Sequence, residues 1–398
     1  MSAIEMNEED MKLKEVTLNR KCELSNISAI SNNNIQKKTI SFGLVTDCHY
    51  IDIDDGYNYN KTVMRRYRQS LDILKEASYF FNKNNTTFNI LLGDIIDGQA
   101  KNLNLHLSGL NTVKDTISIC KSPWYYVIGN HECYNFTRFE MYNLLIPSTN
   151  QPKCTPEKLY YSYTPQVGFR CIILDGYEIS VMNATTKEYT TLADMIVREK
   201  NHNYAAGSSN WFKDIPTENE RYVPFNGQVS KDQVLWLENV LKSAIASGEK
   251  CIVFCHMPLY LPVTHEKNLL WNCEEVLDVL HQANAEVANT VLLCVGGHDH
   301  NGGYSVDSHG IHHLVPPSPI ECALGEVSYG RIEVTYTVDS VGTTTVGTTT
   351  TTNTTAAVGS NSTNLTGSTE VVGPCVDIEW IGKTPHQSRM WPTKVTEP

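Results

Sequence analysis

The chain has 398 residues, enough for one large domain or two ordinary ones. Its 32 basic and 44 acidic residues give a net charge of −12, which argues against broad binding to nucleic-acid backbones, where affinity comes from basic patches. It does not exclude a small phosphate ester as substrate, because a bound metal pair can reverse the local charge. The sequence has no run of about 18 apolar residues, so no membrane span is expected.

Strands and helices alternate along most of the chain, between an expected flexible leader (1–38) and a C-terminal tail (385–398). Apolar runs of strand length occupy residues 39–47, 88–94, 124–130, 169–177, 250–258 and 290–300. Helical periodicity covers residues 62–82, 103–120, 232–247 and 273–283. This alternation predicts a layered α/β domain over residues 39–384.

The last part of the domain has a different pattern. Residues 330–338 and 375–382 both alternate in polarity, as paired strands of a hairpin do. Between them lies a segment rich in Thr, Gly, Ser and Asn, with few large apolar groups (341–370). Such a composition buries too little surface to offset chain entropy, so we expect a disordered insertion at the hairpin tip.

Five short motifs, each beside an apolar run, place polar ligands at strand ends. They are DCHY at 47–50, GDIIDG at 93–98, GNHE at 129–132, CHMP at 255–258 and GGHDH at 296–300. Ligands that converge from several strand ends are a usual way for an α/β fold to build a metal site. Taken singly, each motif is more often a turn or a packed core histidine. The ordered set of five favours a two-metal phosphoesterase.

The expected metal ligands are carboxylates, an amide and imidazoles: Asp47, His49, Asp94, Asn130, His256, His298 and His300. Asp94 is placed to bridge two ions. Two divalent ions ~3.5–4 Å apart can clamp a phosphoryl group and generate a nucleophile near neutral pH. His131 can stabilise the transition state or protonate the leaving oxygen, and Asp97 can accept a hydrogen bond from it.

This ordered set resembles the calcineurin-like metallophosphoesterases, whose motifs are D-x-H, G-D-x-x-D, G-N-H-E/D, H and G-H-x-H. The resemblance implies a four-layer αββα sandwich, with two mixed sheets flanked by helices. It also implies one ion held by Asp47, His49, Asp94 and His300. The other would be held by Asp94, Asn130, His256 and His298.

A more specific resemblance covers residues 40–335. FGLVTDCHYIDIDDGYNYN with RRYRQSL, VPFNGQVSKDQVLWL, and HMPLY with LLWN look like the manganese-dependent ADP-ribose/CDP-alcohol diphosphatases. It implies Mn²⁺ as the cofactor, with Mg²⁺, Fe or Zn²⁺ as other choices, and a small nucleoside diphosphate sugar or alcohol as substrate. Animal members often carry Gln where His49 stands, a difference expected to change metal preference.

A nucleotide needs an aromatic or apolar surface for its base and donors for its second phosphate. The candidates for these contacts are Tyr57, Tyr59, Phe136, Phe225, Asn226 and Tyr304. Aromatic residues near a site more often form wall or core, so each remains open. Arg65, Arg66 and Arg68 form a basic cluster that is either part of the site or a solvated helix face.

Several of the 12 cysteines lie in apolar runs, which indicates buried free thiols in a reducing compartment. The start of the chain lacks the apolar segment of a secretory signal, so a cytoplasmic location is expected. The protein is also expected to be a monomer. Three alternatives stay open: a cyclic-nucleotide or other phosphoesterase on the same scaffold, a non-catalytic scaffold, and a structural zinc protein. No ligand is missing, which disfavours the scaffold, and no paired CxxC occurs, which disfavours zinc.

Overall fold

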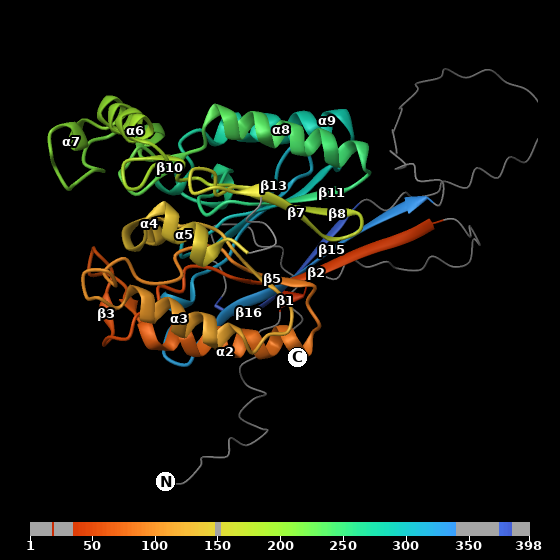
Figure 1. Ribbon diagram of the computed structural model, residues 1–398, viewed down its shortest axis with the longest axis horizontal. Coiled ribbons are helices and arrows are strands. Elements are labelled where there is room, and N and C mark those ends of the chain that lie inside the picture. The colour runs from red at the N-terminus through yellow and green to blue at the C-terminus, as the bar shows by residue number, and fades with distance from the viewer. Residues whose placement is uncertain (1–17, 20–34, 148–152, 340–373, 384–398) are drawn as a thin grey trace, which may run out of the picture.

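Two six-stranded sheets lie between helices that cover their outer surfaces (Figure 1). The structure is a computed structural model that describes residues 18–19, 35–147, 153–339 and 374–383. Both sheets contain parallel and antiparallel pairs. The four-layer αββα sandwich predicted from the sequence is therefore confirmed.

The first sheet has the order β1-β16-β15-β2-β5-β6. Its strands are β1 (Leu18–Asn19), β2 (Ile35–Val45), β5 (Phe88–Leu91), β6 (Trp124–Tyr126), β15 (Ser328–Asp339) and β16 (Cys375–Gly382). Strands β2, β5 and β6 run parallel, whereas β15 and β16 form the predicted antiparallel hairpin. Helix α2 (Tyr67–Lys83) packs on β2 and β15, and α3 (His106–Ile117) packs beside α2.

The second sheet has the order β13-β14-β12-β11-β8-β7. Its strands are β7 (Tyr161–Gln166), β8 (Phe169–Ile173), β11 (Lys250–Phe254), β12 (Val291–Val295), β13 (Gly303–Val306) and β14 (His312–Val315). The four central strands are parallel, and the edge strands β7 and β13 are antiparallel. Helices α8 (Lys231–Ala246) and α9 (Cys273–Glu286) contact each other and cover the face that includes β11 and β12.

Aromatic side chains join the two sheets across the core. Phe42 of β2 stacks on Phe88 of β5 at 5.0 Å between ring centroids, and it meets Phe254 of β11 edge-on at 5.6 Å. Phe169 of β8 meets Tyr336 of β15 edge-on at 5.2 Å. These contacts hold the sheets face to face, so the ends of strands in both sheets lie close together.

The remaining elements lie in the connections. They are β3 (Gly56–Tyr57), β4 (Met64–Arg65), α4 (Asn130–Asn135), α5 (Arg138–Leu145), β9 (Ile179–Ser180), α6 (Lys187–Lys200), α7 (His202–Ala205), β10 (Gly227–Gln228) and the short 3-10 helices η2 (Thr217–Asn219), η3 (Leu261–Val263), η4 (Glu266–Asn268) and η5 (Pro319–Glu321). None of the helices in the described ranges is long and apolar enough to cross a bilayer.

The structure differs from the sequence prediction at a few boundaries. The helix expected over 62–82 begins at Tyr67, because Met64–Arg65 pairs with Gly56–Tyr57 as a short ribbon. The first long strand starts at Ile35, before the expected residue 39, and Leu18–Asn19 of the expected leader pairs with β16. The rest of the predicted leader up to residue 34, the Thr-rich insertion and the tail lie outside the described residues.

Candidate metal centre

The loops that follow the parallel strands hold four of the expected metal ligands in left-handed backbone conformations. The φ angles are 48° at Asp47, 45° at His49, 50° at Asp94 and 67° at His298. Non-glycine residues rarely adopt this region, and such strain persists only where the surroundings impose it. Strained residues gathered in one place are typical of a functional site.

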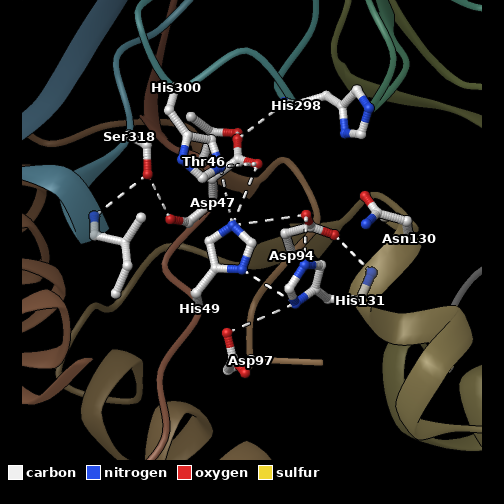
Figure 2. A network of polar contacts seen from close by, with 12 residues as sticks. Thr46, Asp47, His49, Asp94, Asp97, Asn130, His131, His298, His300 and Ser318 are labelled. Atoms are coloured by element: carbon white, nitrogen blue, oxygen red, sulfur yellow. Dashed lines mark hydrogen bonds and ion pairs between the residues drawn. The ribbon is translucent and has the colours of Figure 1, made fainter. Parts of the chain in front are cut away.

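Backbone hydrogen bonds tie the first two loops together. The Asp47 amide donates to the Gly93 carbonyl at 3.2 Å, and the His49 amide donates to the Asp94 carbonyl at 2.8 Å. The Ser318 hydroxyl adds a hydrogen bond to the Asp47 carbonyl at 2.8 Å (Figure 2). The two carboxylates are therefore presented by a single hydrogen-bonded unit.

Glu132, the last residue of GNHE, fixes a third loop to this unit. Its buried carboxylate accepts hydrogen bonds from the amides of Asp94, Ile95 and Gly129, each at 2.8 Å. Burial raises the pKa of Glu132 to about 7, against the lowering effect of the backbone hydrogen bonds. The sequence analysis gave this residue no role, although its place at the third position of a helix start is a common capping signal.

One group of possible ligands joins Asp47, His49 and His300. The facing Nε2 atoms of His49 and His300 lie 3.1 Å apart, and they lie 3.7 Å and 3.5 Å from Asp47 Oδ1 (Figure 2). His49 Nε2 also lies 3.6 Å from Asp94 Oδ2. The ring of His49 thus stands between the two carboxylates.

A second group joins Asp94, His256 and His298. Nε2 of His256 lies 3.5 Å from Asp94 Oδ2 and 4.0 Å from Asp47 Oδ1. Asn130 lies beside this group, and the Tyr177 hydroxyl donates to its amide oxygen at 3.5 Å. All seven residues expected to bind metal therefore gather around Asp47 and Asp94.

Three of the histidines have one ring nitrogen fixed by an oxygen acceptor. Nδ1 of His256 bonds to the Leu92 carbonyl at 2.7 Å, and Nδ1 of His300 bonds to Glu321 at 2.8 Å. Nε2 of His298 bonds to the side-chain oxygen of Asn226 at 2.9 Å. Such contacts set the tautomer of metal-binding histidines and leave the other nitrogen with a lone pair to offer.

The polar atoms of the centre fit divalent ions. Asp47 Oδ1 and His256 Nε2 are buried and make no hydrogen bond among the residues that the structure describes, although they face each other. Buried polar atoms normally have partners, so this unpartnered pair of ligand atoms fits a site for a bound cation. A donor set of carboxylates, imidazoles and one amide oxygen suits Mn²⁺, Fe or Zn²⁺.

The pKa values show the same demand for positive charge. Burial lowers the pKa of His256, but Asp94 and Asp47 raise it to about 10. Burial also lowers the pKa of His300, but Glu321 and Asp47 raise it to about 9. Burial raises the pKa of Asp47, yet contacts with His300 and His49 hold it well below its usual range. The carboxylates thus favour positive charge at this place, which bound divalent ions would supply.

His131 lies at the edge of the metal centre and lines the cavity above it. Its Nδ1 is 3.1 Å from Nδ1 of His49, and its Nε2 is 3.8 Å from Asp94 Oδ2. Burial lowers the pKa of His131 to about 4. Asp97 is 4.0 Å from His131, so the expected hydrogen bond between them is absent. Asp97 instead lies between His131 and Arg65, whose guanidinium is 3.7 Å away.

Of the six residues expected to contact substrate, some lie at the metal centre and others do not. Phe136 is buried against His106, and Tyr304 is buried with its hydroxyl 2.5 Å from Nδ1 of His312, so neither forms a substrate wall. Both predictions were wrong, because nearness to a motif in sequence does not set the direction of a side chain. Tyr57 is exposed on β3 and does not line either cavity at the site.

Phe225, Asn226 and Tyr59 do lie at the site. The ring of Phe225 is 5.7 Å from that of His298, and Tyr59 is an exposed wall residue. Asn226 is fully buried and donates to the carbonyls of Arg221 and Lys267 at 2.9 and 2.8 Å, so it orients His298.

Two adjoining cavities open at the metal centre. The first, of about 290 Å³, lies over the ligands and includes His49, Asp94 and His298. The second, of about 820 Å³, lies beside it. They share six lining residues, which include two cations: Arg65, Asn130, His131, Phe225, Lys267 and Asn268.

Aromatic rings line the larger cavity: Tyr59, Tyr134, Trp211, Phe212 and Phe225. Trp211 and Phe212 lie 5.9 Å and 6.4 Å from Phe225 between ring centroids. The sequence analysis missed both rings, because they lie in a loop far from every motif. Of the three clustered arginines only Arg65 reaches the cavities, since Arg66 bonds to the Cys322 carbonyl and Arg68 pairs with acidic residues.

Comparison with known proteins agrees with this geometry. Residues 40–302 match the calcineurin-like phosphoesterase family, and this range includes all five motifs. The chain belongs to the calcineurin-like phosphoesterases. This family membership makes it a metal-dependent phosphoesterase with a two-metal centre.

The matches to named relatives cover most of the length of this calcineurin-like phosphoesterase. A manganese-dependent ADP-ribose/CDP-alcohol diphosphatase of Arabidopsis thaliana is 36% identical over 74% of this chain and 90% of its own. One of Mus musculus is 33% identical over 74% of this chain and 87% of its own. The crystal structure of a dimetal phosphatase from Danio rerio matches with a TM-score of 0.68 and 30% identity, covering 75% of this chain and 95% of that one.

We predict that Glu132→Ala lowers the free energy of unfolding by at least about 2 kcal/mol, because three buried amides lose their acceptor. It should also weaken metal binding, since Asp94 loses one of its backbone anchors. Urea unfolding and metal titration measure the two effects. Glu140→Ala is the matched control, because Glu140 makes the same kind of contact to Thr137 at the exposed start of α5. A loss no larger than that of the control would contradict a clamping role for Glu132.

Proposed function

We propose that the protein hydrolyses the diphosphate bond of ADP-ribose, CDP-choline and related nucleoside diphosphate sugars or alcohols. The products would be a nucleoside monophosphate and a phosphorylated sugar or alcohol. One observation carries this proposal: a cavity lined by aromatic rings opens directly onto the metal centre. The names of the related diphosphatases, of which the match covers 90% and 87%, support the same substrates.

The cavities match the parts of such a substrate. Arg65 and Lys267 stand where the two cavities meet, so they can bind the phosphate that is not attacked. Trp211, Phe212 and Phe225 offer ring faces to a nucleobase. A simple phosphomonoester would use neither feature, so the larger cavity favours a nucleotide.

We assign Asp47, His49, Asp94 and His300 to one Mn²⁺ ion. Asp94, Asn130, His256 and His298 are assigned to the other. When bound, the ions would polarise the phosphoryl group and supply a nucleophile near neutral pH. The protein's own part is to hold these ligands rigidly, through Glu132, Asn226 and Glu321.

We propose that His131 acts on the leaving oxygen, either by protonating it or by stabilising the charge that develops on it. It faces the cavity where the diphosphate would lie, and its backbone amide donates to Asp94 Oδ1 at 2.8 Å, which holds its position. Asp97 and Arg65 flank it, so Asp97 acts on His131 through charge and not through a direct hydrogen bond.

The competing function is a cyclic-nucleotide or other phosphoesterase on the same scaffold. A turnover panel with Mn²⁺ and with Mg²⁺ separates them: ADP-ribose, CDP-choline, cyclic AMP, a phosphopeptide and single-stranded DNA. We expect the first two to have the highest kcat/KM, and EDTA to abolish turnover until Mn²⁺ is added. A preference for cyclic AMP or the phosphopeptide would overturn the proposal.

We also propose that the protein works in the cytoplasm as a monomer, without nucleic acid or membrane partners. Every cysteine in the described ranges is a free thiol, as a reducing compartment favours. The sequence Asn135-Phe136-Thr137 is a glycosylation signal that a secreted protein would expose to modification, but this asparagine is not accessible. Asn135 is fully buried and donates to the carbonyls of Asp97 and His131, so the folded protein has no room for a glycan there.

Trp211→Ala is expected to lower kcat/KM for ADP-ribose and CDP-choline by ~5- to 100-fold, because stacking contributes ~1–3 kcal/mol per base. Hydrolysis of bis(p-nitrophenyl) phosphate, which has no nucleobase, should change little. Tyr79→Ala is the control, since it removes an exposed ring on α2 outside the cavities. Equal losses on all three substrates would mean that Trp211 supports the fold and not the base.

His131→Ala should cut kcat by ~10²–10⁴, the usual contribution of a positioned acid–base group, with metal content unchanged. The loss should be smaller for a p-nitrophenyl ester than for an alkyl ester, because a good leaving group needs no proton. Steady-state kinetics on the two esters and metal analysis provide the measurements. Equal losses would assign His131 to charge stabilisation instead of proton donation.

His49→Gln should keep activity with Mn²⁺, because an amide oxygen can replace imidazole in an octahedral site. It should lower affinity for Zn²⁺ or Fe²⁺ more than for Mn²⁺, since nitrogen donors favour the softer ions. His49→Ala should lose more activity than His49→Gln with every metal. If the two variants share the metal dependence of the wild type, His49 does not bind metal.

A further inference from the structure

A second cluster of metal-binding residues lies at the other edge of the second sheet. It joins His281 of α9 with Asp307 and His309 of the turn between β13 and β14. Because β14 runs parallel to β12, the turn that precedes β14 lies at the amino ends of these strands. The catalytic loops follow their carboxyl ends, so the two clusters are on opposite edges.

Asp307 is the centre of this cluster and is held firmly. Its Oδ1 accepts hydrogen bonds from the amides of His309 and Ile311, both at 2.9 Å. Its Oδ2 lies 2.9 Å from Nε2 of His281 and 3.0 Å from Nε2 of His313. The carboxylate is therefore fixed by the turn and presents one oxygen to two imidazoles.

The two outer histidines are arranged side by side. The rings of His281 and His309 stack with centroids 3.8 Å apart and planes 13° from parallel. Because the lone pair of an imidazole lies in the plane of its ring, the His309 ring would turn about its side-chain bonds when both rings bind one ion. Asn284 of α9 donates to the carbonyl of His309 at 3.2 Å, which ties the turn to the helix. His309 is exposed, so the cluster is open to solvent on one side.

The spacing is close to that of a coordinated ion. Two ligands ~2.0–2.1 Å from a tetrahedral metal are about 3.3–3.4 Å apart. His281 Nε2 and Asp307 Oδ2 lie 2.9 Å apart, at hydrogen-bond distance, so they would separate by about half an ångström to hold an ion between them. One ligand atom from each of His281, Asp307 and His309 lies within 4.8 Å of the other two.

His313 is placed to support the site and not to complete it. It is buried, stacks on Tyr260 at 4.5 Å between ring centroids, and directs Nε2 at Asp307. Because a carboxylate oxygen can only accept, Nε2 of His313 donates the hydrogen bond to Asp307. A donor of this kind orients a metal-binding carboxylate.

We propose that His281, Asp307 and His309 form a third metal site, separate from the catalytic pair, that binds Zn²⁺ or a similar transition ion. Two imidazoles and one carboxylate favour such ions over Mg²⁺ or Ca²⁺, and the solvent side leaves a position for water. The ion would link α9 to the β13–β14 turn and stabilise that edge of the sheet. This proposal does not depend on the substrate proposed above.

The test measures zinc bound to the full-length, tag-free protein after its catalytic centre has been loaded with Mn²⁺. Wild type, His309→Ala and the control His202→Ala are dialysed against the same low concentration of Zn²⁺ and analysed for both metals. His202 is an exposed histidine on α7, so it corrects for loose binding to surface imidazoles. Exchange of Mn²⁺ for Zn²⁺ at the catalytic centre is common to all three proteins and cancels.

We expect wild type and His202→Ala to bind one more zinc per chain than His309→Ala. Turnover with Mn²⁺ should be the same in all three. Zinc should also raise the melting temperature of wild type more than that of His309→Ala. An anomalous diffraction peak at the zinc edge, between His281 and Asp307, would place the ion. Equal zinc content in wild type and His309→Ala, or no peak at the cluster, would show a hydrogen-bonded cluster without metal and overturn the proposal.

Discussion

The structure depends on two carboxylates buried together. Asp47 and Asp94 both lie within 4.0 Å of the same two imidazoles, those of His49 and His256, and all four side chains are almost fully buried. Two buried negative charges are costly unless positive charge is close. The neighbouring histidines, and divalent ions when bound, meet this demand, and the loops around the carboxylates are shaped to bring them near.

That demand explains why the loops accept strain and why certain positions must be glycine. A β-carbon at Gly297 would collide with Thr46 Oγ1 and Asp47 Oδ2, and one at Gly129 would collide with Asp94 Oδ1. The loops can therefore approach each other closely only because these residues lack side chains. Glu132 then accepts hydrogen bonds from three amides of two loops at once. Because these bonds form only in the folded domain, folding itself sets the geometry of the metal centre.

The sequence predicted which candidate ligands would gather, because these residues are local to strand ends. Once the strands are parallel, the residues that follow them must meet at one edge, as Asp47, Asp94 and Asn130 do. The aromatic wall of the larger cavity was predicted poorly, because Trp211 and Phe212 reach it through long-range packing that leaves no local pattern. Phe136 and Tyr304 failed for the converse reason: each follows a motif but turns into the core. The start of helix α2 at Tyr67 was not predicted either, because Met64–Arg65 pairs with Gly56–Tyr57 and helical periodicity cannot reveal such a pairing.

The two cavities would have different roles: the smaller one holds the metal ligands, and the larger one offers the surface that would select the substrate. The smaller cavity is formed by loops that the buried carboxylates require, so its residues can change little without loss of the ions. The part of the larger cavity that the smaller one does not share is formed by the 206–216 loop and by side chains such as Tyr59, which bear no part of the metal geometry. If the proposed nucleotide substrate binds here, changes in that part would alter which nucleotide is accepted without altering how the phosphate is attacked. Under the same proposal, the cations Arg65 and Lys267, common to both cavities, would link the position of the base to the position of the reacting phosphate.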